Sequence, residues 1–428
     1  MSGLFMRRKA SAERGAVATI VAVFFGGLVV AGMLALTVDV GNIMWERRQL
    51  QNGADAGALA LAVTCANSAP KCDPNTTPTG LGADSIAPLI SKNASDGVSG
   101  LQVSTATTVN GQCGRATGNA AMPTCASASS NASLSDLGRC PALPAWLSAN
   151  PAIPYVETYT ISKQASGSTV LPGYLSRMLT GAAGGTTVTA CSRAAWGPAG
   201  PGHDIVLPVV ISECDWKSQT GYNGTPGSAV YPAGPTGAYP GYDTTTRPWP
   251  AVEKKVYSKG NPTTCDTSAP GGTAPGGFAA LDAVGAVACE ATITTVSGYK
   301  WAHGDTGNDT PCPAVDLLPY LGKVVHIPVF DCLTSAPVTV ISTTDCNSGN
   351  GNNTYYRISG FAAFYLSGWY FSNSTQASLR PPNAVPCANG DRCMSGWFLK
   401  DVVSDAPITS PPAGGTPNYG LTAIKPAG

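Results

Sequence analysis

The stretch AVATIVAVFFGGLVVAGMLALTV, residues 16–38, is the strongest structural signal in the chain. No charged residue lies between Arg14 and Asp39. A helix of these 23 residues is long enough to cross the hydrocarbon core of a bilayer, which is about 30 Å thick. The sequence therefore predicts a membrane-spanning helix. The residues expected to anchor it are Ala16, Val17, Ile20, Phe24, Phe25, Leu28 and Val38.

The charges on either side of this run predict its orientation. Four basic residues precede it, and only Glu13 opposes them. The positive-inside rule then places residues 1–15 in the cytoplasm as a short tail and everything after Asp39 outside the cytoplasm. We predict a single-pass protein of the cell membrane. The four basic residues are Arg7, Arg8, Lys9 and Arg14.

Two other interpretations of the apolar run are a cleaved secretory signal peptide and a buried core helix. The apolar core of a signal peptide has roughly 7–15 residues and ends at a cleavage site of small residues. This run is longer and leads into the charged stretch 39–48. An uncleaved anchor fits these features better.

Helical spacing continues after the membrane segment. Apolar and small residues recur along one stripe, which Arg47 interrupts, and we predict one helix over residues 16–62. The many small residues near its end would let another helix or a sheet approach the backbone closely. The stripe consists of Ile43, Leu50, Ala54, Ala58 and Leu61.

Three short motifs accompany this helix: ERGAVA at 13–18, VDVG at 38–41 and RRQLQNGADA at 47–56. Together they resemble the N-terminal region of TadE/TadG-like proteins of the tight-adherence pilus assembly system. The resemblance implies a membrane-anchored pilus-assembly or minor pilin-like component whose partners are the bilayer and other pilin-like or pilus-assembly membrane proteins. It brings no catalytic residues. The positions that carry it are Arg14, Gly15, Asp39, Gly41, Arg47, Leu50, Gln51, Asn52, Ala54, Asp55 and Ala56.

Many TadG-like proteins also carry a von Willebrand factor A domain, whose metal site needs an Asp-x-Ser-x-Ser run after a buried strand. This sequence has no such run. The nearest lookalike, DTTT at 243–246, follows a loop rich in Pro and Gly. We therefore do not expect that domain.

Composition limits the partners and the compartment. Only 12% of the residues are charged and the net charge is zero, so the chain cannot neutralise many phosphates and nucleic acid binding is not expected. Fourteen cysteines spread through a chain rich in Gly and Pro predict disulfides in an oxidising compartment. Short separations favour the pairs Cys65 with Cys72, Cys332 with Cys346, and Cys387 with Cys393.

The outer part is predicted to be α+β and mainly antiparallel. Residues 63–150 are rich in small polar residues and predict a loop-rich segment pinned by disulfides. Residues 151–405 contain period-two apolar runs separated by turn residues and predict a β-rich module. Residues 354–371 are expected to form one bent strand or two strands broken near Gly360 and Gly368. Residues 406–428 are expected to be a flexible end.

A search for catalytic, cofactor and metal motifs gives no candidate site. The three histidines, at 203, 303 and 326, are each isolated, and no CxxC, HExxH, Walker or nucleophile-elbow motif occurs. We expect no enzymatic activity, cofactor or metal.

The sequence leaves two rival functions open. The first is a surface adhesin or glycan-binding module anchored by one helix, with the aromatic loop 221–250 as its contact surface. The second is an envelope hydrolase that uses Asp204, Glu213 and Asp215. Glu213 and Asp215 would face the same side of an edge strand, where solvation is the ordinary explanation of two carboxylates.

Overall fold

The structure is a computed structural model. It describes residues 9–74, 86–94, 98–101, 111–125, 140–173, 185–200, 207–224, 228–232, 253–259, 265, 280–281, 293–296, 299–305, 317–335, 346, 354–371, 374–380, 382–387, 391–404, 407–408 and 418–428.

The chain folds as two compact units. Unit 1 comprises Met1–Ala149, Tyr155–Ala194 and Pro426–Gly428, and unit 2 comprises Asn150–Pro154 and Ala195–Lys425. This division differs from the predicted boundaries at 63, 151 and 406. The strands up to residue 194 pack with the long N-terminal helix, so they belong to unit 1 even though their period-two pattern resembles that of the later strands.

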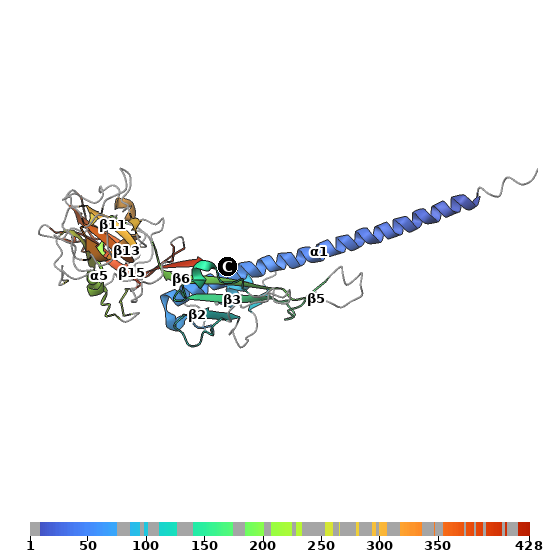
Figure 1. Ribbon diagram of the computed structural model, residues 1–428, viewed down its shortest axis with the longest axis horizontal. Helices are drawn as coiled ribbons and strands as arrows, with labels where there is room; N and C mark the ends of the chain where they lie inside the picture. The colour runs from blue at the N-terminus through green and yellow to red at the C-terminus, as the bar shows by residue number, and fades with distance from the viewer. Residues whose placement is uncertain are drawn as a thin grey trace, which may run out of the picture. The chain divides into compact units, whose positions relative to one another are not determined.

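Helix α1 (Lys9–Asn67) is one continuous element of 59 residues. It contains no proline, so no backbone hydrogen bond is lost along its length. It ends at Asn67, five residues beyond the predicted Ala62. The short 3-10 helix η1 (Ala69–Lys71), which contains Pro70, follows it. Figure 1 shows α1 running far past the strands of unit 1.

The sheet of unit 1 is built around β3 (Tyr155–Ser162). On one side β3 pairs antiparallel with β1 (Ser99–Leu101) and β2 (Gln112–Arg115), and on the other side its neighbour is β6 (Thr189–Pro198). Helix α1 packs on β3 and on the short helix α2 (Ile86–Lys92). The smaller elements are helix α3 (Ala145–Ser148) and the paired strands β4 (Leu171–Pro172) and β5 (Gly185–Thr186).

The sheet of unit 2 is built around the 17-residue strand β13 (Tyr355–Phe371). Its first half lies between β11 (Tyr299–Asp305) and β12 (Val324–Thr334), and its second half pairs with β15 (Arg392–Leu399). Most pairings are antiparallel, and the pair of β7 (Ile211–Ser212) with β12 is parallel. Strands β8 (Lys254–Lys259), β9 (Ala280–Leu281), β10 (Ile293–Val296) and β14 (Ser374–Gln376) complete this sheet. The other elements are α5 (Glu213–Thr220), η5 (Leu318–Tyr320), and strands β16 (Asp401–Val403) and β17 (Leu421–Pro426), which pair with each other and are not part of this sheet.

Strand β13 resolves the open choice between one strand and two. It stays continuous through Gly360 and Gly368, with a register shift against β15 between Leu366 and Gly368. A Cβ on Gly368 would lie 2.8 Å from the Gln376 carbonyl oxygen, so only glycine fits where β14 approaches this strand.

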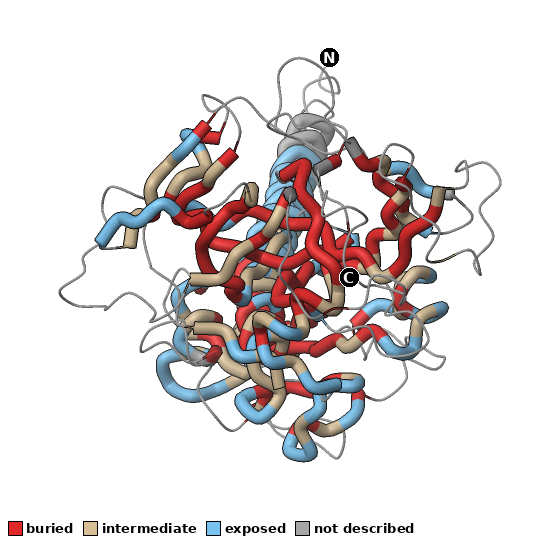
Figure 2. The backbone as a smooth tube through the Cα atoms, turned by 90° about the vertical axis from the view of Figure 1, so that its left-hand side faces the viewer, coloured by how far each residue is buried: buried red, intermediate tan, exposed pale blue. Residues whose placement is uncertain are grey.

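Large apolar side chains fill the core of unit 2. Trp216 on α5, Ile327 on β12 and Phe364 on β13 are fully buried there. Figure 2 colours the buried residues red and the exposed residues pale blue. Unit 2 is therefore a packed module and not a set of loops held by disulfides alone.

Six disulfides occur among the described residues. Each joins two residues of the same unit. They include the three short-range pairs expected from the sequence, Cys65–Cys72, Cys332–Cys346 and Cys387–Cys393. The others are Cys113–Cys125, Cys140–Cys191 and Cys214–Cys265.

The end of the chain differs from the flexible end that the sequence predicts. Strand β17 pairs in parallel with β16, and Leu421, Ala423 and Ile424 on it are buried. These residues are apolar and gain stability from burial. The Pro and Gly residues at 411–420, which suggested flexibility, precede them. The fold class is α+β: a long apolar N-terminal helix followed by a disulfide-bonded, mostly antiparallel β-rich region, as predicted.

Candidate functional site

The N-terminal half of α1 exposes its apolar side chains. From Val17 to Val38 the large hydrophobic residues are exposed, Phe24 and Phe25 by 69% and 66%. A continuous apolar surface of this size is unfavourable in water and favourable in lipid. Within the described part of the chain, α1 is the one helix long and apolar enough to cross a membrane. It fits a single-pass membrane anchor.

The C-terminal half of α1 is packed on unit 1. Leu50, Ala54, Ala58 and Leu61 are buried, which is the stripe that the sequence indicates. Leu50 packs with Val188 and Ala190 beside β6. The apolar stripe of this half is therefore buried within the chain.

Two glycines bring the helix close to its neighbours. A Cβ on Gly57 would lie 3.1 Å from Cγ2 of Thr158 on β3 and 3.2 Å from Cγ2 of Ile86 on α2. A Cβ on Gly53 would lie 3.2 Å from the carbonyl oxygen of Ile90. The small residues of this segment therefore set the helix-to-sheet distance.

Polar contacts fix the register of α1 on the sheet. The Gln51 amide donates from Nε2 to Asp55 Oδ1 and to the Cys191 carbonyl oxygen, each at 3.0 Å. The Thr160 hydroxyl donates to the Leu50 carbonyl oxygen at 3.0 Å. These bonds are partly or fully buried, so sliding the helix along the sheet would leave polar groups unpaired.

Most of helix α1 matches a known protein family. Residues 15–63 match the Tad family, described as putative Flp pilus-assembly TadE/G-like. No curated protein and no solved structure matches the chain. We call residues 15–63 the Tad-like segment.

The motif residues of the Tad-like segment divide into two groups. One group is buried or half-buried: Asp39, Leu50 and Ala54 are buried, and Gln51, Asp55 and Ala56 are half-buried, with Gln51 bonded to Asp55. The other group is exposed and consists of Gly41, Arg47 and Asn52. The fold of this chain accounts for the first group. The side chains of Arg14, Gly15 and Ala16 lie outside the described residues.

A buried polar cluster lies in the unit 1 sheet on which the Tad-like segment packs. Glu157 on β3 accepts a hydrogen bond from Arg193 Nε at 2.7 Å and from the Tyr159 hydroxyl at 2.5 Å. Arg193 also donates to the carbonyl oxygens of Pro141 and Ala427. Burial and the nearby Glu157 carboxylate raise the pKa of Tyr159 well above its usual value, so this phenol stays protonated as a donor.

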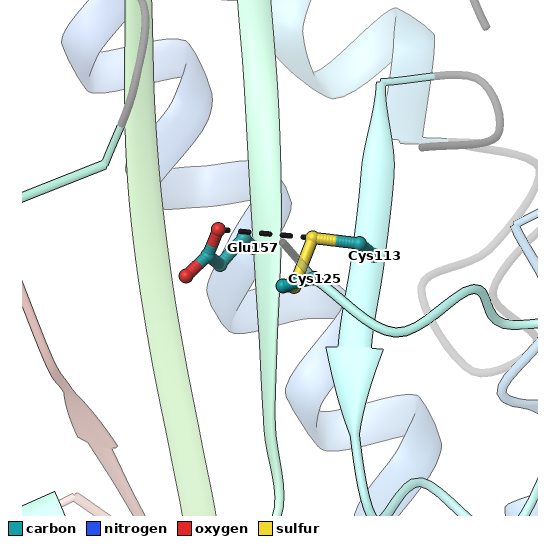
Figure 3. Close-up of side chains that lie close together, drawn as sticks. All are labelled: Cys113, Cys125 and Glu157. Atoms are coloured by element: carbon teal, nitrogen blue, oxygen red, sulfur yellow. Dashed lines mark hydrogen bonds between the residues drawn. A yellow bond between two sulfur atoms is a disulfide. The ribbon is translucent and has the colours of Figure 1, made fainter. Parts of the chain in front are cut away.

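Glu157 also lies among cysteines, which gives it the outline of a metal site. Figure 3 shows Glu157 beside the Cys113–Cys125 disulfide, with Cys113 Sγ 3.7 Å from Oε2. The Cys140–Cys191 disulfide also lies close to the Glu157 carboxylate. A disulfide sulfur has no hydrogen to donate and no thiolate charge to offer a metal. The cluster is thus structural in its oxidised form.

The residues of the rival functions lie elsewhere. Glu213 and Asp215 begin helix α5 and are not on a strand: the Ser212 hydroxyl accepts from the Asp215 amide as N-cap, and Gly221 ends the helix with a φ of 72°. Asp204 lies outside the described residues.

The aromatic loop 221–250 is described only in part. Tyr222 and Tyr231 pack against the core of unit 2, and the Tyr231 hydroxyl donates to the Asn418 carbonyl oxygen at 3.4 Å. These two tyrosines therefore cover a core edge. Tyr239, Tyr242 and Trp249 lie outside the described residues, as do His203 and the DTTT run at 243–246.

Proposed function

We propose that this chain is a membrane-anchored, minor pilin-like structural component of a tight-adherence type pilus assembly system, without enzymatic activity. The observation that carries the proposal is the division of labour along the Tad-like segment. The large side chains exposed on its first half are apolar, its second half packs on unit 1, and Gly41, Arg47 and Asn52 are exposed. A helix of this kind can hold an outer module in the membrane and still contact other helices.

The proposed topology places the N-terminus in the cytoplasm and both units outside. The basic residues before the apolar run and the disulfides after it support this arrangement, because disulfides persist in oxidising compartments. The partners are the bilayer and other pilin-like or pilus-assembly membrane proteins.

The free motif positions give the test of this function. In a host that lacks the gene, wild-type protein should restore pilus assembly, and Gly41→Leu should fail to restore it although the protein accumulates normally in the membrane. Among the described residues, a Cβ on Gly41 meets no atom within 4 Å, so we expect the substitution to leave the fold intact and to obstruct only a neighbouring helix. Lys71→Ala, an exposed change beyond the end of α1, is the matched control.

Normal piliation with Gly41→Leu and with Asn52→Leu would contradict helix contacts at these positions. Protease added to the outer face of the membrane should cleave unit 2 and leave residues 1–15 intact. Cleavage only after the membrane is opened would contradict the proposed orientation.

A further inference from the structure

The direction of β3 along α1 shows which end of unit 1 faces the apolar run. Thr158 of β3 lies against Gly57, whereas Thr160, two residues later, bonds to the Leu50 carbonyl oxygen. Higher numbers on β3 therefore meet lower numbers on α1. The C-terminal end of β3, and the turn that follows it, point toward the apolar run.

The turn after β3 leads into a second contact with the helix. The Gly167 amide donates to the Gln164 carbonyl oxygen, which closes a tight turn, and the chain then enters β4. Leu171 of β4 packs in the same cluster as Ile43 and Leu50. The neighbouring Val170 is 44% exposed. Strand β4 therefore packs against the same cluster as Ile43, at the end of unit 1 that faces the apolar run.

The helical rise places this level close to the end of the bilayer. Ile43 lies five residues after Val38, which is about 7.5 Å along a helix. The headgroup region adds roughly 5–8 Å to each side of the hydrocarbon core. Ile43 therefore falls in the headgroup layer when residues 16–38 span the core, and β4 lies at the end of unit 1 nearest this layer.

The exposed side chains at this level suit a headgroup layer. Met44 and Trp45 are 62% and 59% exposed, and helix side chains tilt toward the helix N-terminus, here toward the lipid. Tryptophan is favoured at membrane interfaces. Arg47, Arg48 and Lys163 are exposed cations at the same end, and long basic side chains can bury their stems while their charge meets phosphate. Of the acidic residues here, Asp39 is buried and Glu46 half-buried.

We infer that this end of unit 1 rests on the membrane surface and binds anionic phospholipid headgroups. The contact comprises Met44, Trp45, Arg47, Arg48, Lys163 and Val170, which we call the juxtamembrane band. The inference rests on the proposed membrane anchoring and adds a second, superficial contact to it. Continuity with the apolar run and the charge of the three cations identify the occupant as lipid.

Fluorescence quenching by lipid tests the depth of the band. The full chain is reconstituted in vesicles of phosphatidylcholine and phosphatidylglycerol that contain phospholipid brominated near the headgroup. We expect quenching of wild-type tryptophan fluorescence, loss of the quenched fraction in Trp45→Phe, and no loss in Trp146→Phe. Trp146 is the matched control because α3 contacts Arg115, at the opposite end of β3. Equal quenching in wild type and Trp45→Phe would overturn the inference.

Hydrogen exchange tests the role of charge. Residues 161–173 should exchange several-fold more slowly in mixed vesicles than in phosphatidylcholine alone, and the variant Arg47→Gln/Arg48→Gln/Lys163→Gln should lose this difference. Lys71→Gln is the control. Unchanged exchange in wild type would overturn the lipid contact.

The anchor and the band can fail separately in these experiments. Failure to protect Val17–Val38 from exchange would contradict the anchor itself. Protection of that run with an unquenched Trp45 would contradict the juxtamembrane band alone.

Discussion

Arg193 joins three separate segments of unit 1. Its guanidinium is 1% exposed, bonds to Glu157, and holds the carbonyl oxygens of residues 141 and 427. A buried charge pair is costly to break because the remaining charge stays uncompensated. Arg193 also packs against the Tyr155 ring, with Cζ 5.4 Å from its centroid.

We predict that Arg193→Met lowers the free energy of unfolding of unit 1 by about 3–5 kcal/mol. Urea unfolding followed by hydrogen exchange of β3 measures this change. Lys217→Met breaks the more exposed Lys217–Glu213 pair and should cost less than about 1 kcal/mol. The double variant Glu157→Gln/Arg193→Met should be more stable than Arg193→Met, and an equal or lower stability would argue against an orphaned charge.

Lys300 on β11 gives unit 2 a pH dependence. Burial lowers the pKa of Lys300 to about 8 from its usual 10.5. The folded chain holds this proton less tightly than the unfolded chain, so below pH 8 the burial penalty is fully present. The penalty disappears as the pH rises from about 8 toward 10.5, and the free energy of unfolding increases over that window.

We predict that Lys300→Met makes unit 2 more stable than wild type at pH 7 and that this gain shrinks steadily as the pH rises from 8 toward 10.5. Denaturation midpoints at several pH values measure it. Lys323→Met, at an exposed position of the same unit, is the control for effects of high pH, such as tyrosine titration, that do not depend on Lys300. A pH-independent gain would contradict a depressed pKa for Lys300.

Single residues such as these were the hardest to find in the sequence. Glu157 and Arg193 stand 36 positions apart, and their other partners are backbone carbonyls at 141 and 427, which no side-chain motif marks. The N-cap of α5 could have been predicted from the sequence. Ser212 lies three residues before Asp215 and Gly221 follows the helix, which is a local start-and-stop signal that the strand interpretation missed.

Helix α1 was the element most visible in the sequence. A long apolar run and a stripe at helical spacing depend on neighbouring residues alone, so residues 16–62 could be predicted without knowledge of the sheet. The partner of the stripe could not be predicted, because the contacts of α1 with β3 and β6 join residues 110 and 140 positions apart. The small residues indicated only that something would approach closely.

We predict that Gly57→Leu destabilises the contact of α1 with β3 and α2 by about 1–3 kcal/mol, because a Cβ there already crowds Thr158 and Ile86. Gly41→Leu should leave stability unchanged or raise it by roughly 1 kcal/mol, since glycine is a poor helix former. Urea midpoints of unit 1 for the two variants give the comparison. Equal effects at both positions would show that Gly57 is not in a close-packed site.

At the scale of the whole molecule, the disulfides of each unit should contribute unequally. The Cys140–Cys191 and Cys65–Cys72 pairs of unit 1 have sequence separations of 51 and 7. The restriction of the unfolded chain grows with the logarithm of loop length, so the longer loop should contribute about 2 kcal/mol more.

We predict that Cys140→Ala/Cys191→Ala lowers the urea midpoint of unit 1 more than Cys65→Ala/Cys72→Ala does. Cys214→Ala/Cys265→Ala removes a loop of the same separation, 51, from unit 2, and should leave hydrogen exchange in β3 unchanged. Loss of protection in β3 in that variant would contradict separate units.

The α+β class followed from composition and periodicity, but the division into units did not. Unit 1 is assembled from three stretches of chain, and its last stretch, Pro426–Gly428, follows all of unit 2. The Gly428 and Ala427 backbones bond to Arg193, which is more than two hundred positions earlier. Periodicity reports on neighbouring residues and cannot show such a return.

This return of the chain orders the biogenesis of the protein. A ribosome makes residues 426–428 after every residue of unit 2, so the hydrogen-bond partners of the Arg193 backbone are synthesised later than all of unit 2. Unit 2 can be complete while unit 1 is still waiting for its final residues. A chain truncated before residue 426 would therefore keep unit 2 and lack the backbone partners of Arg193 in unit 1.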